Sequence, residues 1–184
     1  TERLGRAWGM VGHLHAVCDT PELRAAYTAT LPLVTEFYTR LGADERLYAK
    51  YKAIDPPTLN PEQTQAHALA LRNFVLSGAE LKGADKTRFA EIQEQLAQLS
   101  QTFSEHVLDA TDAWSCVVDE TEISGIPEDV LQTAKALAES QGKPGYVLTL
   151  KMPCYLPVMQ YANHRGLREK LYRAYTTRAS DQFE

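Results

Sequence analysis

The sequence predicts a mainly α-helical fold with a small two-stranded β element near residues 115–150. Over most of the chain, apolar residues recur at steps of three or four, which is the period of an amphipathic helix. Proline and capping residues stand where such helices would begin. Only two short runs, at 116–118 and 146–150, have the β-branched or aromatic composition of strands. We therefore expect antiparallel and kinked helices together with one small sheet.

Two helices in the first half are predicted from the residues at which they start. Thr20-Pro21 begins one of them, and Pro32 should kink or break it. Asn60-Pro61-Glu62-Gln63 is a capping box with proline at the first helical position. The helix that it begins should end at Ser77-Gly78, where glycine permits the turn. Between these two helices, Asp55-Pro56-Pro57 is expected to be a rigid loop.

The longest helix is predicted to run from Asp85, its N-cap, to Asp112, over about 40 Å. One face is an apolar stripe that should be buried, made of Phe89, Ile92, Leu96, Leu99, Phe103, Val107 and Ala110. The other face should be solvated and carries Gln93, Glu94, Gln98, Glu105 and Asp109. A helix of this length usually needs a partner, and we expect the helix that begins at Asn60 to cover the stripe.

The last third of the chain combines strands and helices. The runs at 116–118 and 146–150 should pair around a helix that Pro127-Glu128-Asp129 opens and Gly142 closes. The apolar positions between 167 and 175 predict an amphipathic C-terminal helix.

Composition excludes several classes of protein. The net charge of −5 argues against nucleic acid as a partner, because that binding depends on neutralising phosphates. No apolar run approaches the roughly 20 residues that span a bilayer, and the N-terminus lacks the apolar core of a signal peptide. Cys18, Cys116 and Cys154 are odd in number and far apart, which indicates free thiols in a reducing, cytoplasmic environment. The start at Thr1 and the end at Glu184 hint at trimming of both ends.

Two clusters contain residue types that bind metal ions. His15 and Cys18 would share a face of a helix that begins near Trp8, but His13 would point away, whereas zinc needs three or four converging ligands. This cluster is therefore expected to serve packing.

A second cluster, Glu105, Asp109 and Asp112, should lie on the solvated side of the long helix. No glutamate has a histidine three residues later, which argues against a di-iron bundle. We expect no metal ligand in this chain.

The motifs of known catalytic sites are also missing from the sequence. There is no Gly-x-Ser-x-Gly turn, no phosphate-binding Gly-x-x-x-x-Gly-Lys loop and no His-Glu-x-x-His zinc motif. Cys116, in an apolar run, is expected to be an inert core residue rather than a nucleophile. We expect no catalytic or cofactor-binding residue here.

The C-terminal helix carries the one conspicuous concentration of charge, made of His164, Arg165, Arg168, Lys170, Arg173 and Arg178. It is either a solvated face or a surface that meets an acidic partner. Whether Arg165, Arg168 and Arg173 contact substrate, another lobe or only solvent stays open at this point.

Several segments, in the same order, resemble the family of zinc metallopeptidases that contains oligopeptidase A and thimet oligopeptidase. They are Thr20-Pro21-Glu22-Leu23-Arg24, Phe74 to Leu81, Leu96 to Ser104, Ser124-Gly125-Ile126-Pro127, Pro153 to Met159, and Leu167 to Ser180, with Trp8, His13-Leu14 and Val17 before them. The resemblance covers Trp8 to Ser180 and is strongest to the bacterial oligopeptidase A branch.

This resemblance implies a mainly helical protein of two lobes beside a deep channel. In the family, zinc sits on a His-Glu-x-x-His helix of the C-terminal lobe, and the N-terminal lobe limits entry to short, unfolded peptides. Residues 1–184 match the N-terminal lobe only, so no catalytic residue of the family maps onto this chain.

We therefore expect residues 1–184 to be the N-terminal, channel-wall lobe of a zinc-dependent oligopeptidase. The complete enzyme would hydrolyse short peptides, including signal-peptide fragments, in the cytoplasm. The expected partners are peptide substrates and the enzyme's own C-terminal lobe, and this segment alone should be inactive and bind no zinc. The alternatives are the same lobe of a dipeptidyl carboxypeptidase, or a freestanding helical adaptor. The rest of the reading frame would separate the adaptor from the other two.

Overall fold

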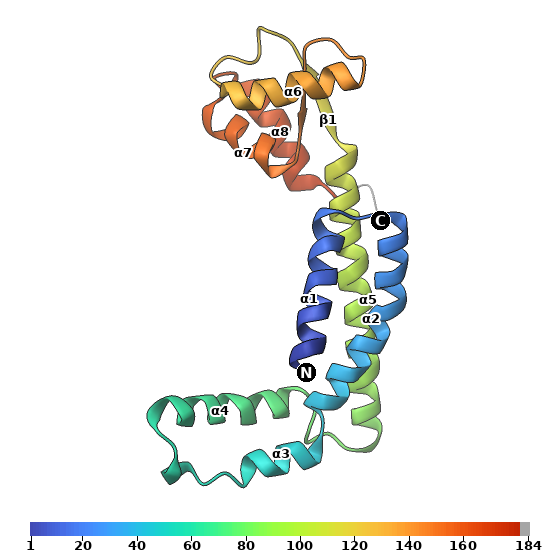
Figure 1. Ribbon diagram of the computed structural model, residues 1–184, viewed down its shortest axis with the longest axis vertical. Coiled ribbons are helices and arrows are strands. Elements are labelled where there is room, and N and C mark those ends of the chain that lie inside the picture. Colours follow the sequence, from blue (N-terminus) through green and yellow to red (C-terminus); the bar gives the residue numbers. More distant parts are fainter. Residues whose placement is uncertain (181–184) are drawn as a thin grey trace. The chain divides into compact units, whose positions relative to one another are not determined.

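The computed structural model describes residues 1–180 and confirms a mainly helical chain with one two-stranded sheet (Figure 1). In chain order the elements are α1 (Glu2–Val17), α2 (Pro21–Gly42), α3 (Glu45–Lys52), the 3-10 helix η1 (Pro56–Thr58), α4 (Pro61–Leu76), α5 (Gly83–Ala113), β1 (Ser115–Val118), α6 (Glu128–Ser140), β2 (Tyr146–Thr149), α7 (Met152–Tyr161) and α8 (Arg165–Thr177). The chain divides into two compact units, Thr1–Gln101 and Thr102–Glu184, which are described separately. That residues 1–184 make up one lobe stays a prediction.

In the first unit, α1 and α2 lie side by side and antiparallel (Figure 1). The Thr20 hydroxyl caps α2 by accepting a hydrogen bond from the Leu23 N–H at 3.2 Å. Of the two effects expected of Pro32, a break is wrong, because α2 continues through it as one helix to Gly42, whereas a kink stays a prediction. Nor does α1 begin near Trp8, since the helix already starts at Glu2.

The segment between α2 and α5 contains a second antiparallel pair, α3 and α4. The predicted capping box of α4 is confirmed, with Asn60 Oδ1 accepting from the Gln63 N–H at 2.8 Å and Gln63 Oε1 from the Asn60 N–H at 3.0 Å. The expected rigid loop after Asp55 holds η1. The helix α3, capped by Asp44, was not predicted.

The long helix α5 is confirmed, but its predicted start and its predicted partner are wrong. It begins at Gly83, ahead of the expected N-cap Asp85. The expected partner, α4, packs mainly against α3, because the Phe74 ring lies 5.5 Å from that of Tyr48 and 5.2 Å from that of Tyr51.

The predicted burial of the α5 stripe is wrong over its centre. Four of its members are exposed: Ile92 (38%), Leu96 (51%), Leu99 (67%) and Phe103 (64%). Only Ala110 is fully buried, while Phe89 and Val107 are half-buried. On the face expected to be solvated, Gln93, Glu105 and Asp109 are half-buried. In the first unit the physical reason is that α1 and α2 pack on the side of α5 that carries Gln93 and Gln101.

The second unit is built around the small sheet, whose strands pair antiparallel with Ser115 opposite Thr149 and Val118 opposite Tyr146. This confirms the predicted strand pairing and the helix α6 between the strands, whereas α7 was not predicted. One face of the sheet, α6, α7 and α8 enclose the core, which includes Cys116, Val118, Val130, Ala134, Leu148, Leu150, Val158, Leu167 and Leu171. Within residues 1–180, no helix is both long enough and apolar enough to cross a membrane.

Candidate functional site

The His13, His15 and Cys18 side chains do not converge in the structure. His15 is buried, whereas His13 and Cys18 are exposed. Among residues 1–180, no three or more His, Cys, Asp or Glu side chains are grouped as they would be around a metal ion. His15 instead belongs to a different arrangement, which the sequence did not reveal.

That arrangement is a polar and aromatic cluster between α1, α2 and α5 of the first unit. The Tyr27 ring is stacked between the rings of Trp8 and His15, with centroids 4.4 and 4.6 Å apart. The amide nitrogen of Gln101 lies 3.2 Å from His15 Nε2 and can donate to it when this ring nitrogen is unprotonated. Burial raises the pKa of the Tyr27 phenol above its ordinary value, which keeps it neutral.

An ion pair closes this cluster at the turn between α1 and α2. Arg24 donates to Asp19 Oδ2 from Nε at 2.7 Å and from Nη2 at 2.6 Å. The other Asp19 oxygen, Oδ1, lies 3.7 Å from His15 Nε2, and Asp19 is only 10% exposed. A carboxylate beside a histidine also occurs in catalytic sites, where the pair activates a nucleophile. Here the neighbouring Cys18 is exposed and the Tyr27 ring is stacked. The geometry therefore favours an interaction that holds α1 and α2 together over a catalytic group.

Sequence reasoning missed Asp19, Arg24, Tyr27 and Gln101 as members of one cluster. Gln101 is 86 positions from His15, so no local spacing could have placed them together. The only signal in the sequence was Gln101 itself, a polar side chain of the long helix that belongs neither to its apolar stripe nor to its predicted solvated face.

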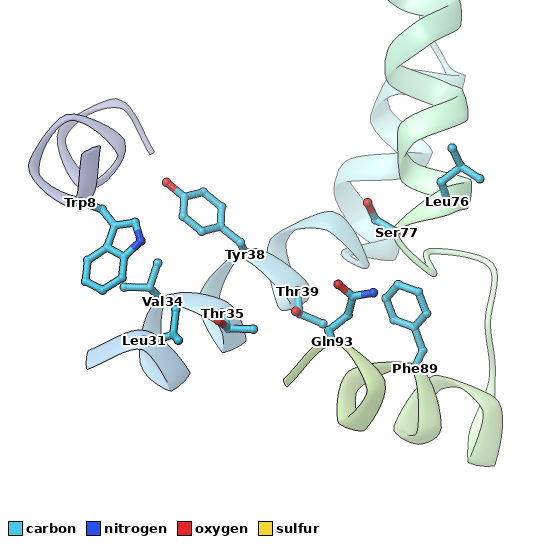
Figure 2. A pocket seen from close by; sticks show the side chains of 10 residues that line it. All are labelled: Trp8, Leu31, Val34, Thr35, Tyr38, Thr39, Leu76, Ser77, Phe89 and Gln93. Atoms are coloured by element: carbon cyan, nitrogen blue, oxygen red, sulfur yellow. The ribbon is translucent and has the colours of Figure 1, made fainter. Parts of the chain in front are cut away.

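A pocket of about 440 Å³ lies beside this cluster in the first unit (Figure 2). Its lining side chains come from α1, α2, the end of α4 and α5, and are Trp8, Leu31, Val34, Thr35, Tyr38, Thr39, Leu76, Ser77, Phe89 and Gln93. All are uncharged, so the pocket can receive an apolar or neutral polar group, and its lining contains no carboxylate, imidazole, amine or thiol. Figure 2 shows the hydroxyls of Thr39 and Ser77 near the Gln93 amide, beside the Phe89 ring.

A second pocket, of about 530 Å³, lies between α6 and β2 in the second unit. Trp114, Val130, Leu137, Val147 and Pro153 give it apolar walls. Its charged rim includes Lys151, which pairs with Asp112 at 3.1 Å, and Asp129. Because this lysine and one of the acids neutralise each other, the rim presents little net charge to a ligand.

The acids on α5 differ from their prediction. Glu105 and Asp109 are half-buried rather than on a solvated face, and exposed Asp112 forms the ion pair with Lys151. Cys116 lies in the core, and burial raises the pKa of its thiol to about 11. At neutral pH this sulfur is therefore protonated and a poor nucleophile.

Most of the basic residues of the C-terminal helix are used within the second unit. His164 caps α8, its Nδ1 accepting from the Leu167 N–H at 3.0 Å. Arg168 donates to the Ala162 carbonyl, and Arg173 pairs with Glu169 at 2.8 Å. Arg178 donates to the Tyr175 carbonyl and lies 3.6 Å from the centre of its ring.

Two of these basic residues remain for an outside partner. Arg165 and Lys170 are exposed and make no ion pair within residues 1–180. The predicted basic face is thus narrower than the sequence suggested.

Comparison with protein families gives a match at the start of the chain. Residues 1–86 match the family model described as "Neurolysin/Thimet oligopeptidase, N-terminal domain".

Curated relatives extend the similarity over nearly the whole chain. Oligopeptidase A of Escherichia coli is 47% identical and that of Salmonella typhimurium 46% identical, each over 97% of this chain and 27% of the relative. An Arabidopsis thaliana protein named "Probable cytosolic oligopeptidase A" is 40% identical over 97% of this chain and 27% of its own length. The chain therefore spans about a quarter of the length of the relatives that it matches.

Proposed function

Since this chain belongs to the family of oligopeptidase A and thimet oligopeptidase, of which it spans the N-terminal part, we propose that it is one wall of an oligopeptidase. The observation that carries the proposal is the identity of 46–47% to two bacterial oligopeptidases over 97% of this chain. The complete polypeptide would hydrolyse short peptides, including fragments of signal peptides. This segment would restrict access by its shape and perform no chemistry.

The catalytic metal of the proposed enzyme is zinc, held by residues outside this chain. The residues described here do not fit that role, because the buried His15 is stacked on Tyr27 and contacts Gln101, while His13 and Cys18 are exposed. We derive no step of peptide hydrolysis from residues 1–180. Zinc would polarise the scissile carbonyl and activate water in the other lobe.

A cytoplasmic location is part of the same proposal. Three cysteines without a disulfide among them are typical of a reducing compartment. One relative carries "cytosolic" in its name, which is said of that plant protein.

The first experiment compares the complete polypeptide with the isolated chain 1–184. We expect the complete polypeptide to contain about one zinc per molecule by elemental analysis and to cleave a short fluorogenic peptide. The isolated chain should do neither. A complete polypeptide without peptidase activity after zinc loading would overturn the proposal, as would a reading frame that ends near Glu184. In the second case the helical adaptor would take its place.

Two matched substrates refine the reaction class. The same peptide with an amidated C-terminus should still be cleaved by an endopeptidase, whereas a dipeptidyl carboxypeptidase requires the free carboxylate. The same sequence within a stably folded protein should resist cleavage if the walls admit only short, unfolded chains. Cleavage of the folded substrate at a comparable rate would contradict the role proposed for this segment.

A further inference from the structure

The exposed centre of α5 is an apolar feature that the proposed function leaves unexplained. Ile92, Leu96 and Leu99, here called the α5 seam, are 38%, 51% and 67% exposed. They stand at steps of four and three residues, on one side of the helix. Three large apolar side chains in one row are more than the scattered exposed leucines of an ordinary surface.

The seam lies on the side of α5 opposite to α1. Gln101 marks the side of α5 that meets α1, through its contact with His15. At about 100° per residue, Ile92, Leu96 and Leu99 lie roughly 140° to 180° around the helix from Gln101. The helix α1 therefore cannot cover the seam without leaving the side on which it packs, and the exposed fractions of the three side chains show that α2 leaves them open.

The charges of α5 also distinguish this face from a solvated one. The first two turns carry Asp85, Lys86, Arg88 and Glu91, as an exposed helix does. From 92 to 103 the only charged residue is Glu94, and it lies about 20° around the helix from Gln101, far from the seam. The seam therefore combines large apolar side chains with uncharged neighbours such as Gln95, unlike the charged first turns.

We propose that, in the complete polypeptide, an apolar helix from the part that this chain does not cover packs onto the α5 seam. This proposal rests on the proposed function, because it takes the chain as part of a longer protein. The chain covers 27% of the length of the two bacterial relatives. Spacing of four and three residues is that of a seam between two helices, so the occupant is a helix with a complementary stripe.

A second copy of the chain is a weaker occupant. The seam extends over two helical turns, shorter than the three or four heptads that usually sustain a coiled coil. The flanking positions that set pairing and register in such dimers hold uncharged Gln93, Gln95 and Ser100. Nothing on this face would therefore orient two copies.

The decisive experiment identifies the occupant directly. A photo-crosslinking amino acid replaces Leu99 in the complete polypeptide, and mass spectrometry maps the crosslinks in an equal mixture of light and isotopically heavy protein. We expect crosslinks within one molecule, to a segment beyond position 184. Mixed light and heavy crosslinks would assign the seam to a second copy. Crosslinks only within 1–184 would mean that this chain covers the seam itself, and the absence of crosslinks would leave it solvated. Each of these three results overturns the proposal.

A pair of substitutions keeps the proposal testable without crosslinking. Leu99→Glu is compared with Gln98→Glu, which adds the same charge at the neighbouring position, in both the complete polypeptide and the isolated chain. We expect Leu99→Glu to lower the melting temperature of the complete polypeptide by at least about 5 °C and that of the isolated chain by less than about 1 °C. Gln98→Glu should change neither by more than about 1 °C. Equal effects of Leu99→Glu in both proteins would contradict the seam.

Failure of this inference can be told from failure of the proposed function. If the complete polypeptide cleaves peptides but gives no crosslink beyond position 184, the seam proposal is contradicted and the proposed function stands. If it gives that crosslink but cleaves no peptide, the proposed function is contradicted and the seam proposal stands.

Discussion

At the scale of single residues, the turn before β2 shows how one glycine fixes the small sheet. Gly145 has φ +71°, and a Cβ there would collide with the Val118 carbonyl oxygen of the paired strand. Gly142, three positions earlier, has φ +63° but open space around it. A substitution of Gly142 therefore tests backbone strain alone, whereas a substitution of Gly145 tests strain together with a steric collision.

We expect Gly142→Ala to cost about 1–2 kcal/mol, the cost of a left-handed backbone for an L-residue. Gly145→Ala should cost clearly more, because the strand β1 must also move away. Urea unfolding followed by circular dichroism measures both. Equal losses of stability would show that the contact with the Val118 carbonyl oxygen adds nothing to the free-energy cost of the Gly145 substitution.

The cysteines give a second prediction at this scale. Burial raises the pKa of Cys116 from 9.0 to about 11, which lowers its thiolate fraction about 100-fold at a given pH, before any loss of access. Exposed Cys18 serves as the internal control. At pH 8 iodoacetamide should label Cys18 readily and Cys116 only after denaturation, as peptide mass spectrometry would show. Fast labelling of Cys116 in the native protein would contradict its place in the core.

At the scale of elements, the strand β2 is the centre of the second unit. Leu148 is fully buried, whereas Val117, on the opposite face of the sheet, is 43% exposed. We expect Leu148→Ala to cost about 2–5 kcal/mol, because it removes buried methyl groups and leaves a cavity. Val117→Ala should cost less than about 1 kcal/mol. Equilibrium denaturation of the two variants checks the difference, and similar values would mean that the burial of Leu148 contributes no more than the exposed Val117.

The helix α5 shows where sequence patterns reach their limit. Its existence and length followed from periodicity, but periodicity only says which residues share a face. The prediction assumed that the most apolar face must be buried within the chain. The helices α1 and α2 lie instead on the face of α5 that carries Gln93 and Gln101. There the Gln101 amide contacts His15, and Gln93 lines the pocket. The contacts of Asp19 with His15 of α1 and Arg24 of α2 could not be predicted for the same reason, because they depend on which helices meet.

At the scale of the whole molecule, burial is distributed unevenly along the chain. Among the described residues, the buried apolar side chains of the first unit are Val34, Ala43 and Ala79, and all others lie in the second unit. The free energy that stabilises a fold scales with the apolar area removed from water. The first unit, taken by itself, should therefore open more easily than the second.

Hydrogen exchange measured by mass spectrometry tests this difference. In the isolated chain, amides of α1, α2 and α4 should exchange at least about tenfold faster than those of β1, β2 and α8. In the complete polypeptide the first unit should gain protection, since a longer chain can supply the burial that it lacks. Uniform protection in the isolated chain would show that the first unit is stable without further contacts.

The order of the matching segments was enough to indicate the family of the chain. The helical class, the capping box at Asn60 and the pairing of the two strands could be predicted from the residues of each element. These depend on local chemistry: a cap needs one side chain three residues from an N–H, and a strand needs β-branched residues between turns. The folded chain was needed to show that His15 contacts Gln101, that α4 packs on α3, and that Ile92, Leu96 and Leu99 face outward. Those outcomes depend on which helices meet, and a helical period is the same whether its apolar face meets the chain at hand or one that follows it.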